Sequence, residues 1–122
     1  MARLLLVEDH VALAEATADF LQNAGLEVRI AASGEQALKT AAAFHPDIIL
    51  CDLRLPDMSG IELARALRAT ASAKHALIAL HSAISEVDLR TLQNQSDVGI
   101  DSFISKPLTE EKLKTLLAGL RS

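Results

Sequence analysis

Oxygen- and nitrogen-bearing side chains stand at the ends of the short apolar runs in this sequence. In chain order they are Glu8, Asp9, Asp52, Ser82 and Lys106. If the runs are parallel strands, their carboxyl ends meet at one edge of a sheet, and these side chains meet there too. Three carboxylates in one crevice repel one another, and a hard divalent cation relieves that repulsion. The pattern therefore predicts a Mg²⁺ site formed by Glu8, Asp9 and Asp52.

The remaining two side chains extend this chemistry toward phosphoryl groups. A metal ion and the ammonium of Lys106 neutralise phosphoryl oxygens, and the hydroxyl of Ser82 donates a hydrogen bond to one of them. A carboxylate is also a competent nucleophile for a phosphoryl group. The set predicts a site that binds a phosphoryl group and can carry it as an aspartyl-phosphate.

Strands and helices alternate along the chain. Continuous apolar runs predict central strands, and partly polar ones predict edge strands. The expected strands are 4–7, 27–31, 48–51, 76–80 and 101–105, and the expected helices are 10–24, 33–45, 59–67, 86–94 and 109–120. The first, third and fourth strands are the apolar ones. The fold class expected is α/β, a five-stranded parallel sheet in the order 2-1-3-4-5 with helices on both faces.

Length and charge limit the classes of function. The chain has 122 residues, which we expect to form one domain over 1–122, with a net charge of −4 and one cysteine. A lone cysteine excludes an internal disulfide and a cysteine-based zinc cage. The sequence shows no basic patch of the kind that nucleic-acid-binding domains carry. Its apolar runs are too short for a membrane span, and its N-terminus does not resemble a signal peptide. We therefore expect a cytoplasmic protein.

The motifs, taken in order, resemble the receiver domain of two-component response regulators, of the CheY-like superfamily. The matching pieces are Glu8-Asp9, the segment from Asp52 to Gly60 with Pro56 inside it, Ser82-Ala83, and Lys106-Pro107. The resemblance runs from Leu4 to Leu120. It implies a signalling switch that accepts a phosphoryl group from a histidine kinase or a histidine phosphotransfer protein, with Mg²⁺ as cofactor. It also implies that the chain catalyses only its own phosphorylation and slow dephosphorylation.

The resemblance implies a role for each matching residue. Asp52 is the phosphoacceptor. Glu8, Asp9, Asp52 and the backbone carbonyl of Arg54 hold the metal. Ser82, Ala83 and Lys106 contact the phosphoryl group, Ser82 and Phe103 form the switch pair, and the Lys106–Pro107 peptide bond is cis.

A few positions depart from the family pattern or stand beside the site. The stretch between Ser82 and Lys106 is long, with the extra length expected at 93–98, next to the fourth helix that usually carries output. Arg54 and Ile84 flank the entrance and are expected to affect dephosphorylation. Cys51 is expected to be a buried apolar residue on the opposite face of the sheet, and His10 a first-turn helix residue.

Several alternatives remain open at this point. The chain is either a single-domain regulator or a receiver excised from a longer protein, such as a hybrid histidine kinase or a response regulator with an output domain. A homodimer through the fourth helix, fifth strand and fifth helix is a further expectation. A phosphorylation-independent interaction module would lose the acidic pair, Asp52 or Lys106, and none is lost. A Mg²⁺-dependent phosphohydrolase of the haloacid dehalogenase kind needs Asp-x-Asp after the first strand, and a flavodoxin needs a Ser/Thr/Gly-rich loop there. This chain has Glu8-Asp9-His10.

Overall fold

A computed structural model of the chain, which describes residues 2–83 and 100–119, contains one parallel sheet. Its strands are β1 (Arg3–Val7), β2 (Glu27–Ala31), β3 (Ile48–Asp52), β4 (Leu77–Ser82) and β5 (Ser102–Ser105). They are ordered β2-β1-β3-β4-β5. The predicted order is confirmed, because the three apolar runs occupy the centre and the two partly polar strands the edges. The strand order reverses between β1 and β3, so their carboxyl ends border the crevice where ligands bind in such sheets.

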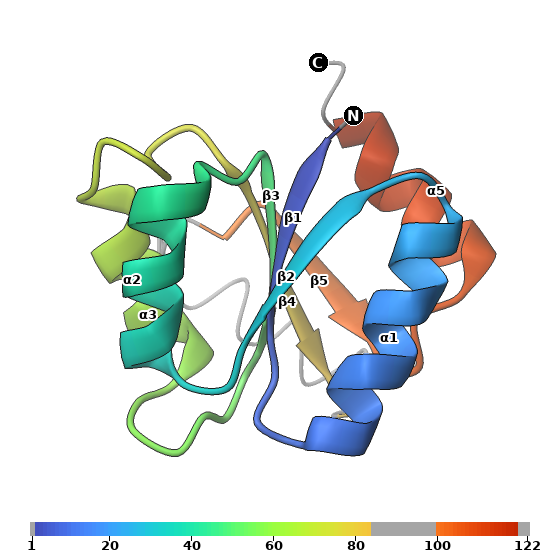
Figure 1. Cartoon of the computed structure of the whole chain (residues 1–122), viewed down its shortest axis with the longest axis horizontal. Helices are drawn as coiled ribbons and strands as arrows, with labels where there is room; N and C mark the ends of the chain where they lie inside the picture. The colour runs from blue at the N-terminus through green and yellow to red at the C-terminus, as the bar shows by residue number, and fades with distance from the viewer. Residues whose placement is uncertain (1, 84–99, 120–122) are drawn as a thin grey trace.

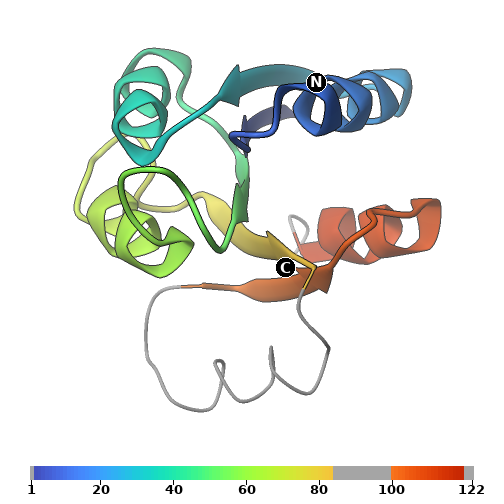
Figure 2. The same ribbon diagram turned by 90° about the horizontal axis from the view of Figure 1, so that it is seen from below.

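Helices cover both faces of the sheet. They are α1 (Val11–Asn23), α2 (Gly34–Phe44), α3 (Gly60–Arg68) and α5 (Glu110–Ala118). Figures 1 and 2 show α2 and α3 packed on one face and α1 and α5 on the other. Within residues 2–83 and 100–119, no helix is long and apolar enough to cross a membrane. The predicted fourth helix at 86–94, Ile84 and the long stretch at 93–98 lie outside the described residues.

Local capping explains where these helices begin. The hydroxyls of Ser33, Ser59 and Thr109 accept the backbone N–H three residues on, at 3.2, 3.1 and 3.2 Å. These three helix starts are therefore confirmed. The prediction for His10 needs correction: it is the N-cap of α1 rather than a first-turn residue, since its Nδ1 accepts the N–H of Leu13 at 3.2 Å.

The sheet separates two apolar clusters. Ile49 and Cys51 face the cluster under α2 and α3, whereas Ile48 and Leu50 face the cluster under α1 and α5. Cys51 is buried, as predicted. Because side chains point alternately to the two faces of a strand, Asp52, at the end of β3, points to the face opposite that of Cys51. Gly60, the first residue of α3, lies so close to the backbone carbonyl of Asp52 that a Cβ there would collide with it.

The end of β4 differs from the sequence prediction. The apolar run suggested a strand ending at residue 80, with the next two residues outside it. In the structure β4 continues through His81 and Ser82, and both side chains are buried. The reason is the ladder on either side: His81 pairs with Asp52 of β3, and Ser82 pairs with Ser105 of β5.

Candidate functional site

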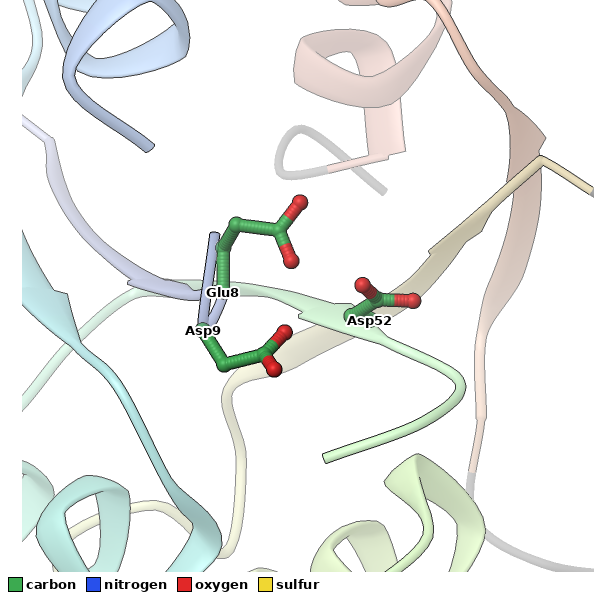
Figure 3. Close-up of side chains that lie close together, drawn as sticks. All are labelled: Glu8, Asp9 and Asp52. Atoms are coloured by element: carbon green, nitrogen blue, oxygen red, sulfur yellow. The ribbon is translucent and has the colours of Figure 1, made fainter. Parts of the chain in front are cut away.

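Three carboxylates meet at the reversal point of the sheet. Glu8 and Asp9 follow β1, Asp52 ends β3, and one oxygen from each lies within 4.8 Å of the others. Figure 3 shows the three side chains converging on one small space. They are brought together because β1 and β3 are neighbours, with Val7 paired to Cys51 just before the acidic residues. The structure thus places together the residues that the sequence predicts as metal ligands.

Lys106 reaches this acidic group from the connection between β5 and α5. Its Nζ lies 2.7 Å from Oε1 of Glu8 and 3.1 Å from Oδ2 of Asp52. Its backbone N–H donates to the carbonyl of Ser82 at 2.7 Å, and its peptide bond to Pro107 is cis. A single ammonium therefore contacts carboxylates from two different strand ends.

The contacts within this cluster set the charge of each group. Burial raises the pKa of Glu8, helped by the neighbouring Asp52 and only partly offset by Lys106. Burial acts the same way on Asp52, yet its hydrogen bonds with Glu8 and Lys106 prevail and lower the pKa of Asp52. Burial opposes the charge of Lys106, but its two carboxylate partners raise the pKa of Lys106. Asp52 is therefore held ionised, and Glu8 is the carboxyl of this pair that first takes up a proton.

The donor set fits a hard divalent cation. Glu8 is 5% exposed, and its Oε2 has no hydrogen-bond partner in the described part of the chain. Asp9 is exposed at the mouth of the site, and Asp52 is half-buried. A buried, unpartnered carboxylate oxygen beside two further carboxylates is a poor arrangement for the protein alone. Oxygen ligands with access to water suit Mg²⁺.

The other predicted site residues lie around this centre. The N–H of Arg54 donates to Oδ1 of Asp52 at 3.4 Å, which keeps the backbone of Arg54 next to the acidic group. Ser82 is buried at the end of β4, and Ala83 follows it, exposed. Phe103 is half-buried in β5, opposite Leu80. The roles of these residues as metal, phosphoryl and switch contacts stay predictions.

His81 is a site residue whose burial the sequence did not reveal. It pairs in register with Asp52, is 5% exposed, and its Nε2 has no hydrogen-bond partner among the described residues. Burial lowers the pKa of His81 to about 4, assisted by the charge of Lys106, so the imidazole is neutral at pH 7. His81 and Lys106 border a groove of about 440 Å³ between α1 and the start of α5. It is also lined by Leu13, Ala16, Thr17, Phe20, Pro107 and Leu108.

The loop after Asp52 is fixed by contacts that no local motif predicts. Both carboxylate oxygens of Asp57 accept backbone N–H groups at the start of α2, from Gly34 and Glu35, each at 2.9 Å. Met58 packs against Gly34, where a Cβ would overlap its side chain. The loop that carries Arg54 is thus anchored to a helix more than twenty residues earlier in the chain.

Comparison with known proteins identifies the family that has this fold. Residues 4–118 match the family model described as the response regulator receiver domain. The chain belongs to the response regulator receiver family. Members of this family are phosphoacceptor switches in two-component systems that interact with histidine kinases or phosphotransfer proteins, and they bind Mg²⁺ at an acidic pocket.

Individual relatives support the same assignment. The DNA-binding response regulator MtrA of Mycolicibacterium paratuberculosis is 35% identical over 120 residues, which cover 98% of this chain and 50% of MtrA. The chain therefore spans about half the length of the curated relatives it matches. Chemotaxis response regulator CheY4 of Vibrio cholerae has a TM-score of 0.84 at 29% identity, covering 98% of both chains.

A third comparison concerns the metal. The receiver domain of the sensor histidine kinase PA1611 from Pseudomonas aeruginosa has a TM-score of 0.85 at 28% identity, covering 99% of this chain and 98% of that one. Its structure is described with a magnesium ion coordinated in the active site cleft.

Proposed function

We propose that this chain is a signalling switch that accepts a phosphoryl group on Asp52 from a phosphohistidine of a histidine kinase or phosphotransfer protein, in the presence of Mg²⁺. The observation that carries the proposal is the contact of one ammonium, Lys106, with Asp52 and Glu8, beside a third carboxylate. This arrangement keeps Asp52 ionised, and an ionised carboxylate is the nucleophile that phosphoryl transfer needs.

In the proposed reaction, an oxygen of Asp52 attacks the phosphorus of the donor. A P–O bond forms, the P–N bond of the phosphohistidine breaks, and its electron pair returns to the imidazole nitrogen. The ammonium of Lys106 stays within reach of Asp52 and stabilises the charge on the phosphoryl oxygens. Glu8, Asp9, Asp52 and the backbone carbonyl of Arg54 would hold Mg²⁺, which supplies further neutralisation of those oxygens when bound.

We further propose that the same site catalyses its own loading from small phosphodonors and slow loss of the phosphoryl group to water. Ser82 and the N–H of Ala83 then contact the phosphoryl group. Ser82 and Phe103, in the adjacent strands β4 and β5, respond to it by changing position. Such a response shifts an existing balance between two packings, because the phosphoryl group interacts differently with each.

The proposed partner docks on the face that carries the groove beside Lys106. The groove beside His81 and Lys106 is mostly apolar, and Val11 and Leu13 are exposed at the nearby start of α1. An apolar surface beside Lys106, whose ammonium contacts Asp52, suits a protein donor better than a small phosphate ester. We propose that switching takes place in the cytoplasm. The same switch serves either as a single-domain regulator or as the receiver part of a longer protein, and a homodimer is a further form that we propose for it.

Intact-protein mass spectrometry tests the assignment. Acetyl phosphate with Mg²⁺ should add one hydroxylamine-sensitive phosphoryl group to the wild-type chain and to Asp19→Ala, an exposed control on α1. Asp52→Ala should take up none, because no other described carboxylate contacts Lys106 except the buried Glu8. Equal labelling of Asp52→Ala and the control would refute the nucleophile assignment, and repeated release of phosphate without labelled protein would indicate a hydrolase instead.

A further inference from the structure

The ammonium of Lys112, in the first turn of α5, donates hydrogen bonds to two residues next to the site, mainly to their backbone carbonyls. It donates to the carbonyl of Ser105 at 2.9 Å, to the hydroxyl of Ser105 at 3.0 Å and to the carbonyl of Pro107 at 3.2 Å. The three donors of a lysine ammonium thus have three protein acceptors. These acceptors belong to the two residues that flank Lys106.

The position of Lys112 within its helix makes this contact notable. Thr109 is the N-cap of α5, so Lys112 occupies the third helical position, where a Glu or Gln would complete a capping box. A positive charge in the first turn is also unfavourable with respect to the helix dipole. Helix formation alone therefore does not favour lysine here, whereas contact with the segment from Ser105 to Pro107 does.

The backbone on both sides of Lys106 is consequently fixed from two directions. The N–H of Lys106 donates to β4 through the carbonyl of Ser82, and the carbonyls of its two neighbours accept from α5 through Lys112. Because the backbone of Lys106 is held, its Cα has a fixed position, from which the side chain reaches Glu8 and Asp52. The hydrogen bonds of the Lys112 ammonium go to Ser105 and Pro107, and within the described residues it makes none to either carboxylate.

We propose that Lys112 is a positioning residue that holds the segment from Ser105 to Pro107, and through it the ammonium of Lys106, in place for phosphoryl transfer to Asp52. This inference rests on the proposed function. Without the Lys112 ammonium, Lys106 retains its charge, but its backbone is held from one direction only, by the hydrogen bond to Ser82. A displacement of about 1 Å in a positioning contact can cost up to roughly 100-fold in rate. We expect a loss of about 10-fold for Lys112→Met, since the hydrogen bond to Ser82 remains.

The experiment compares phosphorylation rates from acetyl phosphate at saturating Mg²⁺. The chain has no Trp or Tyr, so labelling is followed by intact-protein mass spectrometry. Lys114→Met is the matched control, because it removes an exposed lysine from the same helix with the same change in charge. Lys112→Arg keeps donors for two carbonyls and should restore most of the rate. Mg²⁺ affinity, measured by titration, should stay within about 2-fold, because Lys112 lies outside the carboxylate cluster.

A double variant separates positioning from a general loss of stability. If Lys112 acts through Lys106, the double variant that carries both Lys106→Met and Lys112→Met should be phosphorylated no more slowly than Lys106→Met alone. Additive losses in the double variant, or equal rates for Lys112→Met and Lys114→Met, overturn the inference. Should Lys112→Met fail to fold, Lys112→Gln takes its place in the same cycle. Failure of wild type to label at all would instead contradict the proposed function, so the two failures are distinct.

Discussion

Replacing Glu8 with Gln should stabilise the metal-free protein while weakening its response to Mg²⁺. Glu8 is buried, one of its oxygens has no hydrogen-bond partner among the described residues, and its pKa is raised by burial and by Asp52. The ionised form of Glu8 is therefore a net cost to the fold. A Gln side chain keeps an oxygen for Lys106 and offers an N–H toward Asp52 in place of a second negative charge.

The size of the effect follows from the buried oxygen. Leaving a buried acceptor unsatisfied costs about 1–3 kcal/mol, so we expect Glu8→Gln to gain about 1–2 kcal/mol at neutral pH. For a domain of this size that corresponds to a rise in Tm of roughly 4–8 °C. Because the pKa of folded Glu8 lies above its ordinary value of 4.5, the gain is absent below pH 4.5 and is complete above the folded pKa.

Thermal unfolding by circular dichroism, with and without Mg²⁺, provides the measurement. At ten times the dissociation constant, Mg²⁺ should stabilise the wild type by about 1.4 kcal/mol, and Glu8→Gln should show a clearly smaller increment. Glu15→Gln, an exposed change on α1 with the same effect on net charge, serves as control. A metal-free Tm at pH 7 that falls, or that rises no more than in the control, would show that Glu8 is not an electrostatic cost.

Three further outcomes follow from the structure. Gly60→Ala should cost about 2 kcal/mol in urea unfolding, because its Cβ meets the backbone carbonyl of Asp52, whereas Gly119→Ala, which meets only a flexible leucine side chain, should cost far less. Asp57→Asn should lower Tm at neutral pH, because backbone hydrogen bonds at the start of α2 lower the pKa of Asp57. The difference in Tm between this variant and the wild type should shrink as the pH falls below 3.8, the ordinary pKa of an Asp. A difference that does not change with pH would contradict the role of the Asp57 carboxylate at the start of α2. Cys51 should stay unmodified by iodoacetamide in the folded protein at pH 8 and react in urea, because burial raises the pKa of its thiol, and rapid native labelling would contradict that burial.

Local patterns in the sequence are sufficient to predict the order of the strands and the meeting of three carboxylates at one edge of the sheet. Continuous apolar runs need cover on both faces, so they had to form the central strands of a parallel sheet. Once the order was set, Glu8, Asp9 and Asp52 had to meet at its reversal point. Ser33, Ser59 and Thr109 marked helix starts because N-capping involves only the next three residues. These inferences depend on spacing within a few residues, which the sequence displays directly.

Tertiary structure alone decided how the groups at that edge are held. His81 looked like a loop residue because its burial comes from strands and helices on either side of it, not from its neighbours in the chain. The cap of α2 by Asp57 and the reach of Lys106 to Glu8 join residues far apart in sequence. The contact of Lys112 with the flanks of Lys106 runs against local helix preference. Burial, pKa direction and such long-range contacts depend on which elements pack together, and no short window of sequence contains that information.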